Sequence, residues 1–198
     1  MTRFCWRCGA ALPAPPPTTC LHCGEQHYLN PRPCGEAVVL RGRQVLLLRR
    51  AVDPYQGCWD IPGGFCEAAE HPMRAAEREL AEEAGLTGRA TAYVGTWMDI
   101  YGPPQPDGPP QPDGPPQPDG PPQPDGIVIH TVVSVYLVEV ADPRSEPRLQ
   151  HDEVTEARWF DLDELPADLA FPVHARPVLT AVAEILAGTA RPLPDRTW

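Results

Sequence analysis

Apolar residues gather in two neighbouring segments of the first quarter of the chain. Segments 35–40 and 44–49 are rich in Val and Leu and flank residues 41–43, an Arg-Gly-Arg sequence that favours a hairpin turn. Residues 45–48 are continuously apolar, as expected of a strand that is buried on both faces. We therefore predict a β-hairpin whose second strand lies inside the fold.

Two longer segments later in the chain also have strand character. Residues 90–100 alternate in polarity, and residues 127–140 form the strongest strand run, rich in Val, Ile and Tyr. In the first segment the alternation places Ala92, Val94, Thr96 and Met98 on one face, opposite Tyr93, Trp97 and Asp99. We expect the two segments to pair with each other.

A helical period replaces the strand pattern over residues 71–84. Pro72 suits the first turn, where a helix has no partner for its amide, and Gly85 suits a left-handed C-terminal cap. At roughly 100° per residue the apolar stripe consists of Met73, Ala76, Leu80 and Ala84. A second amphipathic helix is predicted over 177–187, ending at Gly188.

The adjoining face of the first helix is acidic. Glu79, Glu82 and Glu83 fall in one sector of the helix, and carboxylates that converge within one turn raise one another's pKa unless a cation is present. Mg²⁺ or Mn²⁺, which prefer oxygen ligands, would relieve the repulsion. The alternative is an ordinary solvated helix face.

The helix and the loop before it carry the pattern G-x5-E-x7-R-E-L-x-E-E-x-G-L, which resembles the Nudix box at every specified position. The matching residues are Gly64, Glu70, Arg78, Glu79, Leu80, Glu82, Glu83, Gly85 and Leu86. Residues 57–64 resemble the G-x-W-x-x-P-G-G sequence that precedes the box in this family. The resemblance implies an α/β fold, an α/β/α sandwich in which the box forms a loop, a helix and a loop beside a mixed sheet.

The resemblance also implies a role for each box residue. Glu79, Glu82 and Glu83 correspond to catalytic metal ligands. A backbone carbonyl at Gly63 or Gly64 is implied as a further ligand of Mg²⁺. The residues with an implied structural role are Gly64, Glu70, Arg78 and Gly85, and the pair Glu70 and Arg78 is expected to hold the loop against the helix.

Residues outside the box are candidates for the catalytic base and for substrate binding. Glu153 resembles a late glutamate of the family that reaches back to the metals as a further ligand or as the base, and Glu156 is the alternative. The substrate candidates are Arg49 and Arg50 for phosphate, and Trp59 and Tyr101 for stacking on a base. A solvated strand end is the alternative for the arginines, and core packing is the alternative for Trp59.

Four cysteines near the N-terminus have the spacing of a metal site. Cys5-x-x-Cys8 and Cys20-x-x-Cys23 form two knuckles, each followed by a glycine. Four thiolates at this spacing suit tetrahedral Zn²⁺ with no open position, so we predict a structural zinc ribbon over 1–30. The alternative is a reduced segment without metal. The total of seven cysteines is odd, which fits a disulfide framework poorly.

The remaining organisation follows from composition. We assign 31–190 to a Nudix domain and 191–198 to a tail. Residues 103–126 repeat Pro-Pro-Gln-Pro-Asp-Gly four times and contain no apolar side chain to bury, so we expect a disordered loop inside a β-hairpin. The alternatives are a proline-rich ligand for a partner domain and a flexible lid.

Net charge and hydropathy limit the partners. The formal net charge of -11 argues against a non-specific nucleic-acid surface, because phosphate backbones favour Lys and Arg. No apolar run approaches the length of a bilayer span, and the first residues do not resemble a secretory signal. We predict a cytoplasmic protein that binds a small-molecule nucleotide and neither nucleic acid nor membrane. A homodimer is left open.

Together these features predict a divalent-metal-dependent hydrolase. The resemblance implies cleavage of the diphosphate bond in a nucleoside diphosphate linked to another moiety, with ADP-ribose or a similar nucleotide sugar favoured as substrate. NAD(H) hydrolysis is the first alternative, because a zinc ribbon before a Nudix domain resembles the arrangement in NADH pyrophosphatases. A non-catalytic scaffold that senses a nucleotide is the second.

Overall fold

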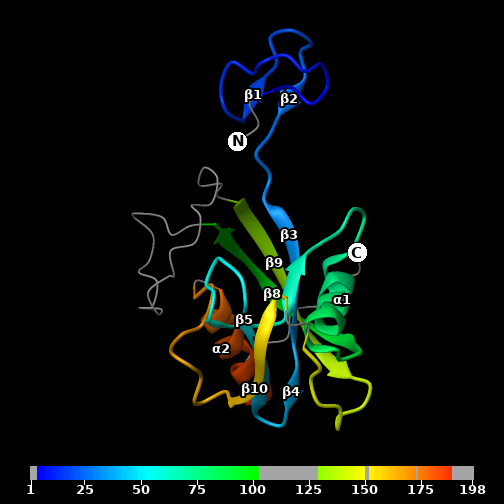
Figure 1. Ribbon diagram of the computed structural model, residues 1–198, viewed down its shortest axis with the longest axis vertical. Helices are drawn as coiled ribbons and strands as arrows, with labels where there is room; N and C mark the ends of the chain where they lie inside the picture. The colour runs from blue at the N-terminus through cyan, green and yellow to red at the C-terminus, as the bar shows by residue number, and fades with distance from the viewer. Residues whose placement is uncertain (1–3, 103–128, 150–151, 173, 189–198) are drawn as a thin grey trace.

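The computed structural model describes residues 4–102, 129–149, 152–172 and 174–188. In this part, the chain forms two four-stranded sheets, two α-helices and a small N-terminal ribbon (Figure 1). The elements in chain order are β1 Thr18–Thr19, β2 Gln26–His27, β3 Arg32–Val38, β4 Leu40–Arg41, β5 Gln44–Arg50, β6 Trp59–Asp60, β7 Gly63–Phe65, α1 Pro72–Ala84, β8 Gly88–Tyr101, β9 Ile129–Val140, β10 Val154–Asp161 and α2 Ala175–Leu186.

The larger sheets have different pairing patterns. One has the strand order β7-β3-β9-β8 and is mixed, because β3 and β9 are parallel while the other pairs are antiparallel. The other has the order β10-β5-β4, with β6 also paired to β5, and all of its pairs are antiparallel. The mixed sheet that we predicted is present, and a second sheet stands beside it.

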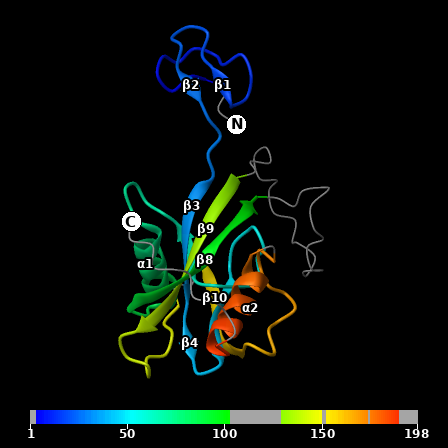
Figure 2. The same ribbon diagram turned by 180° about the vertical axis from the view of Figure 1, so that it is seen from behind.

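The two helices cover opposite sides of the strands, as the two opposite views show (Figures 1 and 2). Successive residues of β3 and β5 alternate between the two apolar layers. The layer under α1 includes Ala37, Val39, Leu46, Leu48, Ala76, Leu80 and Ala84. The layer under α2 includes Val38, Val45, Leu47, Val135, Val178, Leu179 and Val182. The predicted α/β/α sandwich is therefore confirmed.

Helix α1 ends where the sequence predicts and begins one residue later than predicted, at Pro72. The Nδ1 atom of His71 accepts a hydrogen bond from the Met73 amide at 3.1 Å, so His71 is the N-cap, and Pro72 follows at the first helical position. Gly85 ends the helix in the left-handed conformation at φ 64°. The acidic sector is thus carried by a helix with both ends fixed.

Strand β3 lies directly against this helix at Gly35. A Cβ atom at Gly35 would be 2.0 Å from the Pro72 carbonyl oxygen and 2.8 Å from the Ala76 amide nitrogen. Because both neighbours are backbone atoms of α1, they cannot turn aside as a side chain would. Glycine at this position sets the spacing between the helix and the sheet.

Three local predictions differ from the structure. The predicted hairpin is limited to the pairs Leu40 with Val45 and Arg41 with Gln44, because β3 pairs instead with β7 and β9. In β8, the predicted alternation fails because the register shifts between Tyr93 and Gly95. Helix α2 begins two residues before Pro177, since proline is tolerated in a first turn. The β8–β9 pairing itself is confirmed.

The N-terminal ribbon lies beyond one end of the sheets and continues into β3 (Figure 1). Its two short strands, β1 and β2, are antiparallel. The apolar clusters of the core contain residues from Cys34 onward, so they include none from the ribbon. Among the described residues, no helix is long and apolar enough to cross a membrane. The predicted repeat loop (103–126) and the predicted tail (191–198) lie outside the described residues, and the domain boundaries stay predictions.

The close approach at Gly35 gives a stability prediction. We expect Gly35→Ala to lower the free energy of unfolding by about 3 kcal/mol or more, because the methyl group forces α1 away from β3. Urea unfolding measures this loss. Gly95→Ala is the control, since the atoms within reach there belong to the Trp97 ring, which can move. Equal losses in the two variants would contradict the assigned role of Gly35.

Candidate active site

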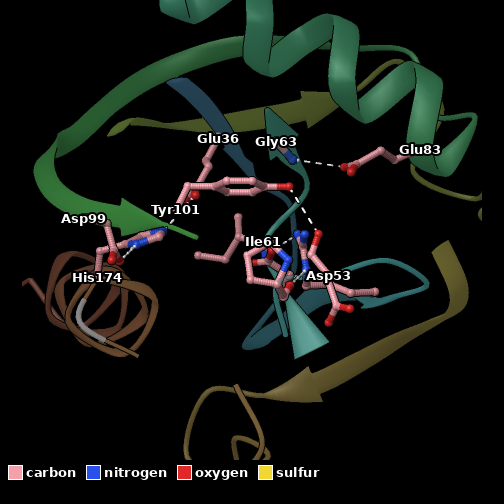
Figure 3. A network of polar contacts seen from close by, with 11 residues as sticks. Glu36, Asp53, Ile61, Gly63, Glu83, Asp99, Tyr101 and His174 are labelled. Carbon is pink, nitrogen blue, oxygen red and sulfur yellow. Dashed lines mark hydrogen bonds and ion pairs between the residues drawn. The ribbon is translucent and has the colours of Figure 1, made fainter. Parts of the chain in front are cut away.

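The site forms where two glycines meet the acidic face of α1. The Gly63 amide donates a hydrogen bond to Glu83 Oε2 at 3.0 Å (Figure 3). A Cβ atom at Gly64 would be 2.3 Å from Glu79 Oε1, so a side chain there would displace that carboxylate. The backbone of β7 therefore lies against two of the three predicted metal ligands, and both candidate carbonyls belong to the same short strand.

Arg78 connects the other box residues. Its guanidinium donates to both carboxylate oxygens of Glu70, at 3.0 and 2.9 Å, and to the Phe65 carbonyl oxygen at 3.0 Å. The loop is held against the helix by these contacts, as the box resemblance implied. Arg78 also donates to Glu79 at 2.8 Å and to Glu82 at 2.9 Å. The sequence did not indicate this second role, which balances charge among the predicted ligands.

The charged forms of Glu79 and Glu83 are disfavoured by their surroundings, so the pKa values of both carboxyl groups are raised. Burial raises the pKa of Glu79, and the charges of Glu82 and Glu153 raise it further against the opposing effect of Arg78. Burial also raises the pKa of Glu83 well above its ordinary value, and Asp60 adds to that shift. A bound divalent cation would favour the charged forms. The donor set therefore fits Mg²⁺ or Mn²⁺, which bind oxygen.

The three predicted ligand glutamates of α1 do not have their carboxylate oxygens all within 4.8 Å of one another.

The four N-terminal cysteines do converge. Within the described ranges, the one group of three or more His, Cys, Asp or Glu ligand atoms within 4.8 Å of one another is the set Cys5, Cys8, Cys20 and Cys23. Its Sγ atoms are 3.7 Å apart in two pairs, and backbone amides of Cys23 and His22 lower the pKa of Cys20 to about 6. Four converging sulfurs suit Zn²⁺.

The structure distinguishes the two late glutamates. Glu153 is exposed just before β10, where its carbonyl oxygen accepts from the Ala51 amide at 2.8 Å, and its charge acts on Glu79. Glu156 is engaged elsewhere, because its carboxylate lies 3.6 Å from Arg49 and 2.8 Å from Arg158. Glu153 therefore stays the predicted base or further ligand, and Glu156 stays the alternative.

The predicted substrate residues lie in different environments. Arg50 is held in a largely buried ion pair with Asp60 at 2.8 Å, while the side chain of Arg49 is 41% exposed. Trp59 is 5% exposed and packs edge-to-face on Phe160, in agreement with the core alternative for this residue. Its ring therefore has no open face for a base.

Tyr101 is the centre of an aromatic group at the end of β8. Its ring stacks on Phe171 with centroids 5.9 Å apart and meets Phe65 at 5.3 Å. Its hydroxyl donates to the Asp53 carbonyl oxygen at 3.3 Å (Figure 3). Sequence analysis missed Phe171, because only the fold brings it beside Tyr101.

A buried charge cluster lies on the other side of β7 and was also missed. His174, the N-cap residue of α2, contacts Glu36 Oε1 through Nε2 at 2.8 Å and Asp99 Oδ2 through Nδ1 (Figure 3). The three residues are 2%, 7% and 8% exposed respectively. Glu36, the single charged residue within the apolar segment 35–40, could have indicated a buried charge in the sequence. No neighbouring residue indicated that His174 or Asp99 would be its partner.

Comparisons with known proteins agree with this geometry. The NUDIX domain family matches residues 32–182. The chain is 29% identical to an ADP-ribose pyrophosphatase of Methanocaldococcus jannaschii, over 73% of this chain and 69% of that protein. It is 28% identical to the NAD-capped RNA hydrolase NudC of Pseudomonas aeruginosa, over 96% of this chain but 59% of that protein. A NUDIX hydrolase structure from Nitrosomonas europaea aligns with a TM-score of 0.64 at 25% identity, covering 94% of this chain and 91% of that one.

Fold and site together define an α/β/α hydrolase domain with an acidic helix beside a diglycine strand. The chain belongs to the Nudix family. The resemblance that the box indicated is therefore confirmed over most of the chain.

The buried cluster predicts a pH dependence of stability. Burial alone would lower the pKa of His174, but Glu36 and Asp99 outweigh burial and raise it to about 10. The contribution of protonated His174 to the free energy of unfolding is complete below the unfolded pKa of about 6.5 and is lost as the pH rises through about 10. Between these two pH values the folded state holds a proton that the unfolded state has released, so stability falls as the pH rises. We expect urea unfolding to show stability falling over this window, by up to about 1.4 kcal/mol per pH unit from this group.

The matched variant is His174→Gln, which has no proton to lose in this range. Its stability should be lower at pH 7 and should depend less on pH between 7 and 10 than that of the wild type. Parallel pH profiles for the two proteins would show that His174 is not the titrating group.

Proposed function

We propose that this protein hydrolyses the diphosphate bond of a nucleoside diphosphate linked to another moiety, with ADP-ribose or a similar nucleotide sugar as the favoured substrate. The observation that carries the proposal is the contact of the Gly63–Gly64 backbone with Glu79 and Glu83 on one helix face. Family membership and the similarity to an ADP-ribose pyrophosphatase support it.

Glu79, Glu82 and Glu83, with the carbonyl of Gly63 or Gly64, would hold Mg²⁺ or Mn²⁺. When bound there, the metal supplies charge neutralisation at the diphosphate and makes water easier to deprotonate. Arg78 keeps the carboxylates separated and oriented through its hydrogen bonds to Glu79 and Glu82. On binding, these carboxylates would exchange part of their contact with Arg78 for the cation.

Residues around this centre would bind the rest of the substrate. Glu153 would accept the proton of the attacking water, or serve as a further ligand, because its charge already reaches Glu79. The partly exposed Arg49 would contact phosphate, and the stacked pair Tyr101 and Phe171 would bind the base. Arg50 would act indirectly, since its guanidinium lies 5.1 Å from the Phe171 ring centroid while Asp60 holds it.

Two other functions remain as alternatives. NAD(H) hydrolysis, or action on an NAD-capped RNA end, is favoured by the similarity to NudC proteins. This chain, however, spans only 50% of the NudC of Stutzerimonas stutzeri and 59% of that of Pseudomonas aeruginosa. A nucleotide-sensing scaffold is the other, but a sensor has no need of the full set of box carboxylates. The absence of nucleic-acid binding, the cytoplasmic location and the homodimer stay predictions.

Activity tests the proposal directly. We expect Mg²⁺-dependent hydrolysis of ADP-ribose to AMP and ribose 5-phosphate, and at least about a hundredfold lower kcat in Glu82→Gln, because a lost metal contact costs several kcal/mol in the transition state. The substrate panel includes NADH, nucleotide sugars, diadenosine polyphosphates, nucleoside triphosphates and an NAD-capped RNA. Product chromatography measures each reaction.

Glu77→Gln is the matched control on the same helix. Glu77 accepts from the Ala90 amide, which glutamine can also do, so the control should keep wild-type turnover. If a folded, metal-loaded wild type hydrolyses no compound of the panel, the result favours the sensing scaffold. Hydrolysis of NADH or of the NAD-capped RNA alone would favour the first alternative.

The ribbon gives a separate prediction about zinc. We expect one Zn²⁺ per chain, and we expect mild chelation to unfold residues up to about Tyr28 while the core stays folded, because the core clusters begin at Cys34. Hydrogen exchange with mass spectrometry resolves the two regions. Unfolding of the whole chain on removal of zinc would contradict this independence.

A further inference from the structure

Two glutamates from different elements contact the glycines of β7. Glu79 of α1 occupies the space where a Cβ of Gly64 would be, and Glu36 of β3 occupies the corresponding space at Gly63, with its Cγ 2.6 Å from that Cβ position. In the β3–β7 ladder, Glu36 is paired with Gly63 and Gly35 with Gly64. Adjacent residues of a strand face opposite ways, so the two glutamates lie on opposite faces of the diglycine.

The Glu36 side chain is fixed from behind by the buried cluster. Its Oε1 contacts His174 Nε2 at 2.8 Å, and the other ring nitrogen of His174 contacts Asp99 (Figure 3). Oε2 of Glu36 is buried and has no hydrogen-bond partner among the residues that the structure describes. The contact with His174 is therefore the hydrogen bond that sets the position of this side chain, and it links β3 to the start of α2.

The position of Gly63 in turn affects the metal site. Its amide donates to Glu83 at 3.0 Å, and its carbonyl is a candidate ligand. The two groups belong to the two peptide planes that meet at the Gly63 Cα, so a shift of this residue would move both. A continuous set of contacts thus runs from His174 through Glu36 and Gly63 to Glu83, connecting the α2 side of the fold to the acidic face of α1.

We propose that Glu36 is a positioning residue of the metal site and that His174 holds it in place. The length of the Glu36 side chain would then set the distance of the Gly63 backbone from Glu83. This inference rests on the proposed function, because it requires that Glu83 and the diglycine bind metal. The competing view is that the cluster only ties α2 to the sheet. Asp99 would then be equivalent to Glu36, since both are buried and both contact His174.

Two substitutions at Glu36 separate length from charge. Glu36→Asp keeps the charge but shortens the side chain by one methylene, so the carboxylate cannot contact His174 while its Cγ stays in place against Gly63. Glu36→Gln keeps the length and an oxygen that accepts from His174. Mn²⁺ binding to the full-length protein, measured by calorimetry without substrate, is the readout. We expect Glu36→Asp to weaken Mn²⁺ binding about tenfold, as changes behind metal ligands generally do, and Glu36→Gln to stay within about twofold of wild type.

Asp99→Asn is the control for the cluster itself. It alters the other partner of His174 without touching Gly63, so it should lower the melting temperature but keep Mn²⁺ affinity within about twofold. Circular dichroism establishes that each variant is folded before titration. Because Glu36→Gln and Asp99→Asn preserve shape, they report on the inference even where the shorter side chain unfolds the protein.

The outcomes are distinct. Weaker binding in Glu36→Asp with retention in the other two variants supports the positioning role. Weaker binding in Glu36→Gln, or equal weakening in Asp99→Asn, overturns it. Wild-type affinity in a folded Glu36→Asp overturns it as well, and leaves the proposed function intact. A wild type that binds no Mn²⁺ overturns both this inference and the metal site on which it rests.

Discussion

The backbone of β3 lies against the first turns of α1 with no space for a side chain at Gly35. This close approach determines where the acidic face of the helix stands relative to β7. Glu83 can then accept from the Gly63 amide, and Glu79 can fill the space beside Gly64. A wider separation would leave both carboxylates in solvent, where their pKa values would be ordinary and their position variable.

The same geometry gathers negative charge on both sides of one short strand. On the α1 side, Arg78 balances Glu79 and Glu82, and on the α2 side His174 lies between Glu36 and Asp99. Each set contains a cationic side chain, whereas Glu83 is buried, has a raised pKa and accepts a hydrogen bond from the Gly63 backbone amide. A divalent cation bound beside it would complete the charge balance on the α1 side.

The aromatic group beside the candidate metal site combines three segments that are far apart in the chain. Tyr101 ends β8, Phe171 precedes α2, and Phe65 ends β7 within the box loop. Only the fold brings these three rings together, because no local period relates residues 65, 101 and 171.

The sequence by itself determined the box helix with its caps, the acidic sector, the cysteine cluster, the β8–β9 pairing and the family. Apart from the β8–β9 pairing, these depend on short spacings, where one helical turn or one knuckle brings residues together whatever the rest of the chain does. The β8–β9 pairing follows instead from two strand-like segments that are consecutive strands in the chain. Only the tertiary structure decided that β3 leaves the predicted hairpin for β7 and β9, that Trp59 is buried, and that Glu36 meets His174 across the fold. Those outcomes depend on contacts between residues up to 138 positions apart, for which no local period exists.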